Sequence, residues 1–100
     1  MKTIFLSYPI NGIDAASQLQ MRKEMMNRIF ALFPNDEIKF IHNADCPVKK
    51  NAGRLYYLGQ AISQMDKCDT VAFYPGYKEA KGCLIERTVA ELYGLEVIEL

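Results

Sequence analysis

The feature that most constrains this chain is a strict alternation of short apolar runs with longer segments of helical periodicity. Four runs have the length and composition of β-strands: 3–8, 37–41, 70–74 and 96–100. Three segments between them repeat their apolar residues at helical spacing: 15–33, 55–65 and the stretch from Gly82 to Gly94. The order β-α-β-α-β-α-β is typical of an α/β protein with a parallel sheet covered on both faces.

Chain length and connection rules narrow this architecture further. One hundred residues are enough for a single domain, so we expect one domain over 1–100. Right-handed crossovers favour the strand order 2-1-3-4. The sequence therefore predicts a small doubly wound parallel sheet of three layers, flavodoxin-like or Rossmann-like. The run 37–41 alternates polar and apolar residues, which indicates a strand exposed on one face, at an edge of the sheet.

Each expected helix carries a set of apolar residues that we predict to face the core. In the first helix these are Ala15, Leu19, Met26, Ile29, Phe30 and Phe33, with Asp14 or Ser17 as the cap. In the second they are Leu55, Leu58, Ile62 and Met65, after a loop over 42–53. In the third they are Ile85, Val89 and Leu92.

Charge and cysteine content exclude several classes of function. The formal net charge is zero and no run of Lys or Arg forms a stripe that could follow a phosphate backbone, so we expect no nucleic acid polymer as partner. No apolar stretch approaches membrane length, and the apolar start is too short for a signal peptide. The three cysteines, an odd number without a Cys-x-x-Cys pair, fit a reducing cytoplasm. His42, near Asp45 and Cys46, lacks an evident set of metal ligands, so we expect no metal.

In sheets of this kind, ligands bind beyond the carboxyl ends of the strands, where the strand order reverses. That crevice lies between the first and third strands, and the loop after the first strand flanks it. Its candidate binding residues are Ser7, Tyr8, Pro9, Asn11 and Gly12. The proline rigidifies this loop and the glycine permits close approach of a ligand. A plain strand-to-helix turn is the alternative interpretation.

The loop over 75–82 flanks the same crevice, and its candidates are Gly76, Tyr77, Lys81 and Gly82. We expect Tyr77 to stack on a base or cover a sugar. We expect Lys78 or Lys81 to meet a phosphate, with solvated lysines as the alternative. Glu86 is expected in the first turn of the third helix, where the helix dipole stabilises the anion. An ionised carboxylate facing a sugar acts as a nucleophile at the anomeric carbon. A surface glutamate is the alternative.

Three blocks of the sequence resemble the nucleoside 2-deoxyribosyltransferase-like superfamily, especially a branch of short proteins with a DUF4406-type domain. Residues 6–12, Leu-Ser-Tyr-Pro-Ile-Asn-Gly, resemble the pattern I-S-G-P-I-T-G of that branch. Residues 68–86, ending in Gly-Cys-Leu-Ile-Glu, resemble a second pattern that ends in G-A-x-x-E. The closing residues 90–98 match as well. Together these blocks cover about half of the chain, in the right order.

The resemblance implies an activity for this site. In the relatives, the Glu of Gly-x-x-x-Glu attacks the anomeric carbon of a nucleoside or nucleotide, and the base leaves. Water or a second base then takes the sugar from the glycosyl-enzyme ester. By resemblance Glu86 is the catalytic nucleophile, the 7–12 loop lines the base and sugar pocket or meets a 5′-phosphate, and no cofactor is needed. Since the known members are oligomers, the resemblance also implies a homodimer.

The chain departs from the pattern of its relatives at three positions, and these keep other interpretations open. Ala61 and Ala80 stand where relatives carry polar residues, and Tyr8 replaces a glycine. The alternative function is therefore a non-catalytic nucleotide-binding protein on the same fold. A receiver or flavin-binding domain is a third possibility, although Ser7-Tyr8-Pro9 is not the acidic cluster of a receiver. Cys83 has either a thiol pKa lowered by the helix amides or a packing role.

Overall fold

The computed structural model describes residues 1–42 and 50–100, and it has the predicted alternation of strands and helices. The elements are β1 (Lys2–Ser7), α1 (Ala15–Leu32), β2 (Ile38–Ile41), α2 (Arg54–Met65), β3 (Thr70–Phe73), η2 (Tyr77–Glu79), α3 (Lys81–Leu92) and β4 (Glu96–Glu99). The short 3₁₀ helix η2 lies within a segment predicted to be a loop. Asp45, Cys46 and Pro47 of the predicted 42–53 loop lie outside the described residues.

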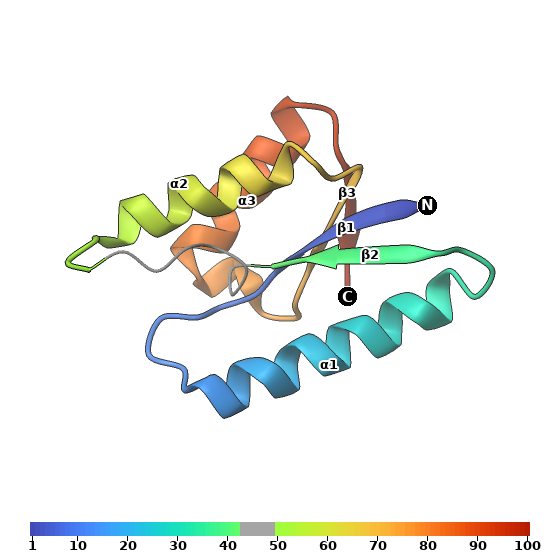
Figure 1. Ribbon diagram of the computed structural model, residues 1–100, viewed down its shortest axis with the longest axis horizontal. Coiled ribbons are helices and arrows are strands. Elements are labelled where there is room, and N and C mark those ends of the chain that lie inside the picture. The colour runs from blue at the N-terminus through green and yellow to red at the C-terminus, as the bar shows by residue number, and fades with distance from the viewer. Residues whose placement is uncertain (43–49) are drawn as a thin grey trace.

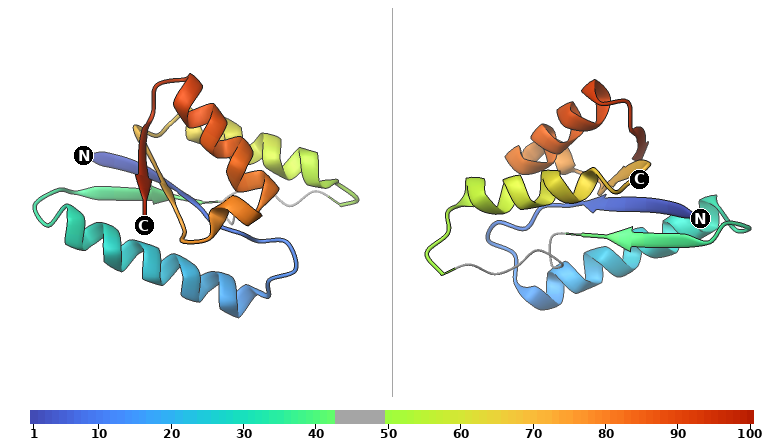
Figure 2. Two further views of the ribbon diagram at one scale, coloured as in Figure 1. Left: turned by 180° about the vertical axis from the view of Figure 1, so that it is seen from behind. Right: turned by 45° about the horizontal axis from the view of Figure 1, so that its top comes forward.

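All strand pairs are parallel and the sheet order is β2-β1-β3-β4, which confirms the predicted topology. Strand β1 is central: Phe5 pairs with Ile41 on β2 and with Val71 on β3. As predicted, β2 lies at an edge. Helix α1 covers one face of the sheet, while α2 and α3 lie together on the other (Figures 1 and 2).

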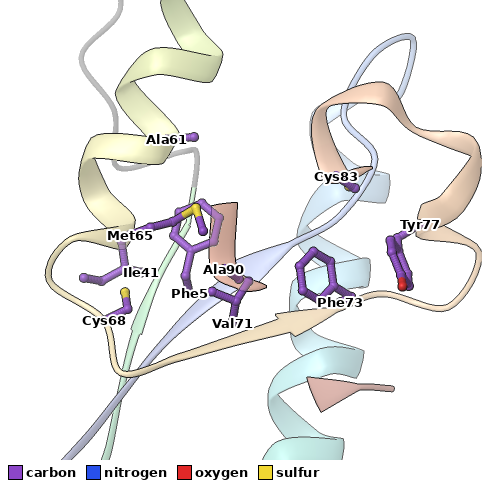
Figure 3. Close-up of a cluster of buried hydrophobic side chains, with 10 residues drawn as sticks. All are labelled: Phe5, Ile41, Ala61, Met65, Cys68, Val71, Phe73, Tyr77, Cys83 and Ala90. Atoms are coloured by element: carbon purple, nitrogen blue, oxygen red, sulfur yellow. The ribbon is translucent and has the colours of Figure 1, made fainter. Parts of the chain in front are cut away.

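The core is divided into two clusters because successive residues of β1 point to opposite faces of the sheet. Ile4 and Leu6 pack towards α1, together with Met25 and Ile29 of that helix. Phe5 packs towards α2 and α3 in the second cluster (Figure 3). By the same alternation Ser7, the last residue of β1, faces the α2–α3 side.

The predicted helix faces are partly wrong. Leu19 and Phe30 of α1 are 43% and 49% exposed. In α3 the buried residues are Cys83, Glu86 and Ala90, whereas Ile85 and Leu92, predicted for the core, are exposed. The second helix shows the same error at Leu55, which is 80% exposed. The physical reason is close packing: small side chains let a helix approach the sheet, and a search for large apolar residues misses that face.

The start of α1 has the predicted residue at its N-cap but not the predicted bond. Asp14 occupies the N-cap position with an extended backbone, and its side chain makes no capping hydrogen bond. The side-chain amide of Gln18 instead donates to the Ile13 carbonyl at 2.8 Å. Within the described residues, no helix combines the length and the apolar character that a membrane crossing requires.

Candidate active site

The carboxyl end of β1 and the second turn of α3 bring two buried polar side chains together. The Ser7 hydroxyl donates a hydrogen bond to Glu86 Oε1 at 2.7 Å. Ser7 is fully buried and Glu86 is only 3% exposed. Residues 83, 86 and 90 share one face of α3 because they are spaced three and four apart. The same face that packs the helix on the sheet therefore presents the Glu86 carboxylate to Ser7.

The second carboxylate oxygen of Glu86 has no such contact. Glu86 Oε2 is buried and has no hydrogen-bond partner among the described residues. Glu86 also lines a cavity of about 700 Å³. A buried polar atom without a partner is uncommon in native proteins and calls for an explanation. Glu86 Oε2 is such an atom, in a residue that lines the cavity.

The cavity is built from three segments that are far apart in the sequence. Residues 8–11 follow β1, residues between Ala52 and Leu58 form the start of α2, and residues from Glu79 to Glu86 include the start of α3. Its volume lies within the usual range for small-molecule sites. The carboxyl end of β1 and the first turns of two helices thus surround one space, which is where the strand order reverses.

The environment of Glu86 differs from the one predicted. Because α3 begins at Lys81, Glu86 lies in the second turn, and the first turn contains no acidic residue. Burial raises the pKa of Glu86 to about 7 from an ordinary value of 4.5, and the hydrogen bond from Ser7 opposes this rise. The prediction of an anion stabilised by first-turn amides was therefore wrong. Desolvation by burial is the larger effect on the pKa of Glu86, and the hydrogen bond from Ser7 offsets only part of it.

Cys83 borders the same polar group. Burial raises the pKa of its thiol to about 11, and the charge of Glu86 adds to this effect against a hydrogen bond with Ser7. The thiol is therefore protonated at neutral pH. Cys83 belongs to the core cluster under α3, which fits the interpretation as a packing residue, and its thiol pKa is shifted upwards, opposite to the lowering expected from the helix amides.

Tyr8 forms part of the cavity wall directly after Ser7. It is 3% exposed, and Arg22 on α1 donates a hydrogen bond from Nη1 to the Tyr8 hydroxyl at 2.8 Å. The same guanidinium lies 5.9 Å from the centre of the Tyr8 ring. Tyr8 is therefore held at its ring and its hydroxyl, and it forms a fixed part of the cavity wall.

Most of the binding residues predicted from the sequence lie together at the cavity. Its lining includes Tyr8, Pro9, Asn11, Lys81 and Gly82, as well as Glu86. Ser7 lies behind Glu86 and contacts it directly. Gly12 and Gly76 lie outside the described lining, and both have positive φ values, 75° and 84°. These two glycines shape the turns that carry the lining residues.

Tyr77 is directed away from the place predicted for it. Its ring packs on Phe73 with the ring centres 4.8 Å apart (Figure 3). Its hydroxyl bonds to the carboxylate of Glu99 and accepts a hydrogen bond from Arg87 at 2.6 Å. Neither Tyr77 nor Lys78 belongs to the described lining of the cavity. Tyr77 therefore anchors the η2 segment to β4 and α3.

The sequence interpretation missed the contribution of α2. Arg54, Tyr57 and Leu58 line the cavity, and none of them was predicted to do so. The strand order itself contained the signal, because α2 and α3 cover the same face and their first turns both lie at the carboxyl edge of the sheet. Ala80 also lines the cavity, whereas Ala61 is fully buried in the core.

The chain matches, over residues 2–99, the model of a family described as a domain of unknown function (DUF4406). It belongs to this family. No curated protein matches the chain. Membership of the DUF4406 family fits the motif resemblance noted above and leaves the activity to be argued from the site. In the described part of the chain, no group of three His, Cys, Asp or Glu side chains is arranged to hold a metal ion.

Proposed function

We propose that this DUF4406 protein cleaves the N-glycosidic bond of nucleosides or nucleotides, as an N-glycosidase or a 2-deoxyribosyltransferase. One observation carries the proposal: Glu86 is buried at a cavity wall with one oxygen held by Ser7 and the other without a partner among the described residues. The resemblance of its motifs to the nucleoside 2-deoxyribosyltransferase-like superfamily supports the same residue as nucleophile.

The proposed chemistry has two displacements at the anomeric carbon. Glu86 Oε2 attacks that carbon, and the bond to the base breaks as the base leaves with the electron pair and takes up a proton. A glycosyl ester of Glu86 results. Water or a second base then attacks the same carbon, loses a proton and releases the Glu86 carboxylate. Two inversions give overall retention of configuration.

The hydrogen bond from Ser7 gives the two oxygens of Glu86 different roles. Because Oε1 is engaged at 2.7 Å, Oε2 is the oxygen that we assign to the attack, and its burial means that the carboxylate has to turn towards the cavity when substrate binds. Attack requires the ionised form, and the pKa of Glu86 is about 7. The rate of base release at low substrate concentration is therefore expected to rise with pH up to about 7 and then level off.

The superfamily resemblance further supports a homodimer in the cytoplasm that acts on small molecules without a cofactor. A non-catalytic nucleotide-binding protein is the second candidate function. What favours it is Ala61, a fully buried core residue that does not line the cavity. By the resemblance, relatives in the superfamily often carry an Asp at this position. In that case the cavity binds a nucleotide and Glu86 accepts hydrogen bonds from it.

The experiment is to incubate the purified protein with each deoxynucleoside and each 5′-monophosphate and to measure free base by chromatography. Wild type is expected to release base, and Glu86→Gln is expected to lower the rate by about a thousand-fold or more. The matched control is Glu91→Gln, an exposed position on the same helix, which is expected to keep the wild-type rate. Absence of release by wild type, or equal release by Glu86→Gln, rejects the enzymatic proposal. Thermal stabilisation by nucleotides without release supports the binding alternative.

A further inference from the structure

Residues 8–13 join β1 to the N-cap of α1, and side chains of α1 hold this segment at both of its ends (Figure 1). At the start of the segment, the Tyr8 hydroxyl accepts a hydrogen bond from Arg22 Nη1 at 2.8 Å. At its end, the Ile13 carbonyl accepts one from the side-chain amide of Gln18, also at 2.8 Å. Gln18 and Arg22 are four residues apart, so they lie on one face of α1.

Between these two contacts the chain makes a β-turn that is closed by one backbone hydrogen bond. The Ile13 N–H donates to the Ile10 carbonyl at 3.2 Å, and Gly12, at the third position of the turn, has a φ of 75°. A positive φ at that position is typical of a type II turn. Ile10 and Asn11 of this turn line the cavity. The shape of this part of the cavity wall therefore depends on the turn staying closed.

The contact between Arg22 and Tyr8 is the stronger of the two contacts with α1. Its donor is a charged guanidinium, and a hydrogen bond with one ionised partner is stronger than one between neutral groups. The same guanidinium lies 5.9 Å from the centre of the Tyr8 ring, within the range of a cation–π interaction. The ring itself is buried in the core cluster that contains Leu6 and Met25. The start of the segment is therefore fixed relative to α1.

The residue before Tyr8 is held by a different part of the fold. Ser7 pairs with Phe73 of β3, and the Ser7 carbonyl accepts a hydrogen bond from the Tyr74 N–H at 3.0 Å. The sheet therefore keeps Ser7 in place, together with its hydrogen bond to Glu86, when the contact between α1 and Tyr8 is lost. The contacts made by α1 act on the cavity wall and not on the carboxylate.

From these contacts we propose that Arg22 and Gln18 are positioning residues for the binding cavity, and that Arg22 acts through Tyr8. They keep residues 8–13 in the shape that meets the ligand. A wall that is ordered before binding loses little conformational freedom when the ligand arrives, so the ligand binds more tightly. Because this wall contacts the ground state and the transition state alike, its loss raises KM and leaves kcat unchanged. The inference rests on the proposed function for the identity of the ligand only.

The first test needs no ligand. It measures amide hydrogen exchange in the free protein by NMR, with the Ile13 N–H as the reporter of the turn. Arg22→Met is expected to raise the exchange rate at Ile13 about tenfold, and Gln18→Ala should raise it as well. Tyr8→Phe keeps the ring in the core, removes only the hydroxyl, and should also raise the exchange rate. In the Tyr8→Phe background, Arg22→Met should add little, because the contact through which it acts is already lost.

The second test measures the kinetics of base release from a deoxynucleoside 5′-monophosphate or deoxynucleoside that the wild-type protein cleaves. Arg22→Met and Tyr8→Phe are each expected to raise KM about tenfold and to leave kcat within about twofold of wild type. The matched control for both tests is Lys23→Met, which removes an exposed cation from the next position of α1 and should behave as wild type. Thermal unfolding shows whether each variant folds, and Tyr8→Phe tests the contact if Arg22→Met does not.

The outcomes separate this inference from the proposed function. An unchanged exchange rate at Ile13 in Arg22→Met and in Tyr8→Phe overturns the positioning role. A rise caused by Arg22→Met that is equally large with and without the Tyr8 hydroxyl overturns the action through Tyr8. A lower kcat with an unchanged KM overturns the role in binding. Absence of base release by wild type, together with the expected exchange rates, rejects the enzymatic function and supports the positioning of the segment by α1.

Discussion

The two ends of the central strand β1 each hold a carboxylate, and their environments differ. At the amino end, Asp69 Oδ2 accepts a hydrogen bond from the Thr3 backbone N–H at 3.0 Å, and Oδ1 accepts one from the Thr70 hydroxyl at 2.7 Å. At the carboxyl end, Glu86 has a partner in the described chain for one oxygen only. Asp69 is exposed to water, whereas Glu86 is 3% exposed.

The pKa values of these two groups move in opposite directions. Burial disfavours the ionised form of Asp69 and of Glu86, and so raises both pKa values. At Asp69 the hydrogen bonds from Thr3 and Thr70 outweigh it and lower the pKa. At Glu86 burial prevails over the single bond from Ser7. A carboxylate with two partners in contact with water stabilises the fold, whereas a buried one with an unused oxygen costs stability and is available for chemistry.

The largest expected effect is on stability at the Glu86 end. A rise in pKa from 4.5 to about 7 corresponds to about 3 kcal/mol, at 1.36 kcal/mol for each pKa unit. Below pH 4.5 the group is protonated in both states and costs nothing. Between pH 4.5 and pH 7 the carboxyl ionises in the unfolded chain but not in the folded protein, so the free energy of unfolding falls as pH rises. Above pH 7 the carboxyl is ionised in both states and the full cost of burying its charge remains. At pH 8 the free energy of unfolding of Glu86→Gln is therefore expected to exceed that of wild type by about 3 kcal/mol.

Urea denaturation at pH 8 and at pH 4.5 measures this effect. The advantage of Glu86→Gln should shrink to roughly a few tenths of a kcal/mol at the lower pH, because the wild-type carboxyl is then neutral in the folded state and half protonated in the unfolded chain. The control is Glu91→Gln, an exposed position on the same helix, which loses an ion pair with Arg87 and should gain no stability at pH 8. Equal stability of Glu86→Gln and wild type at pH 8 would contradict the burial argument for this carboxylate.

The next effect concerns the bond between Ser7 and Glu86. Ser7→Ala removes a donor to the ionised form, so we expect the pKa of Glu86 to rise further, by about one unit. Base release at pH 6 should then fall about tenfold, while the rate at pH 9 should change little. Ser7→Thr keeps a hydroxyl and should restore the wild-type profile. An equal loss at both pH values would show a purely structural role for Ser7.

The difference between the two ends also shows what the sequence was able to predict. The alternation of runs was enough for the sheet order and for the crevice, and the predicted residues Tyr8, Lys81 and Glu86 lie around one cavity. The raised pKa of Glu86 could not be predicted from the sequence, because the burial of its side chain depends on how close α3 lies to the sheet. Small residues such as Cys83 and Ala90 set that distance, and they carry little signal in a search for apolar faces. Arg54 was missed because its place in a cavity shared by α2 and α3 depends on how the two helices pack, which local sequence spacing does not reveal.

The smallest expected effect is at the amino end, where Asp69→Asn leaves one of two hydrogen bonds without a suitable acceptor. Because the site is exposed to water, the expected loss of stability at pH 7 is only about 1 kcal/mol.

The pH dependence of the stability contributed by Asp69 is opposite in sign to that of Glu86. With a lowered pKa, the stabilisation by Asp69 is present above its ordinary value of 3.8 and is lost as pH falls through the folded value. Urea titrations at pH 7 and at acid pH should therefore show a difference from wild type that decreases as the pH falls below 3.8. Base release should be unaffected, because Asp69 pairs at the opposite end of the sheet from the cavity. A loss of activity in Asp69→Asn as large as that in Glu86→Gln would break the division between a stabilising end and a reactive end of this sheet.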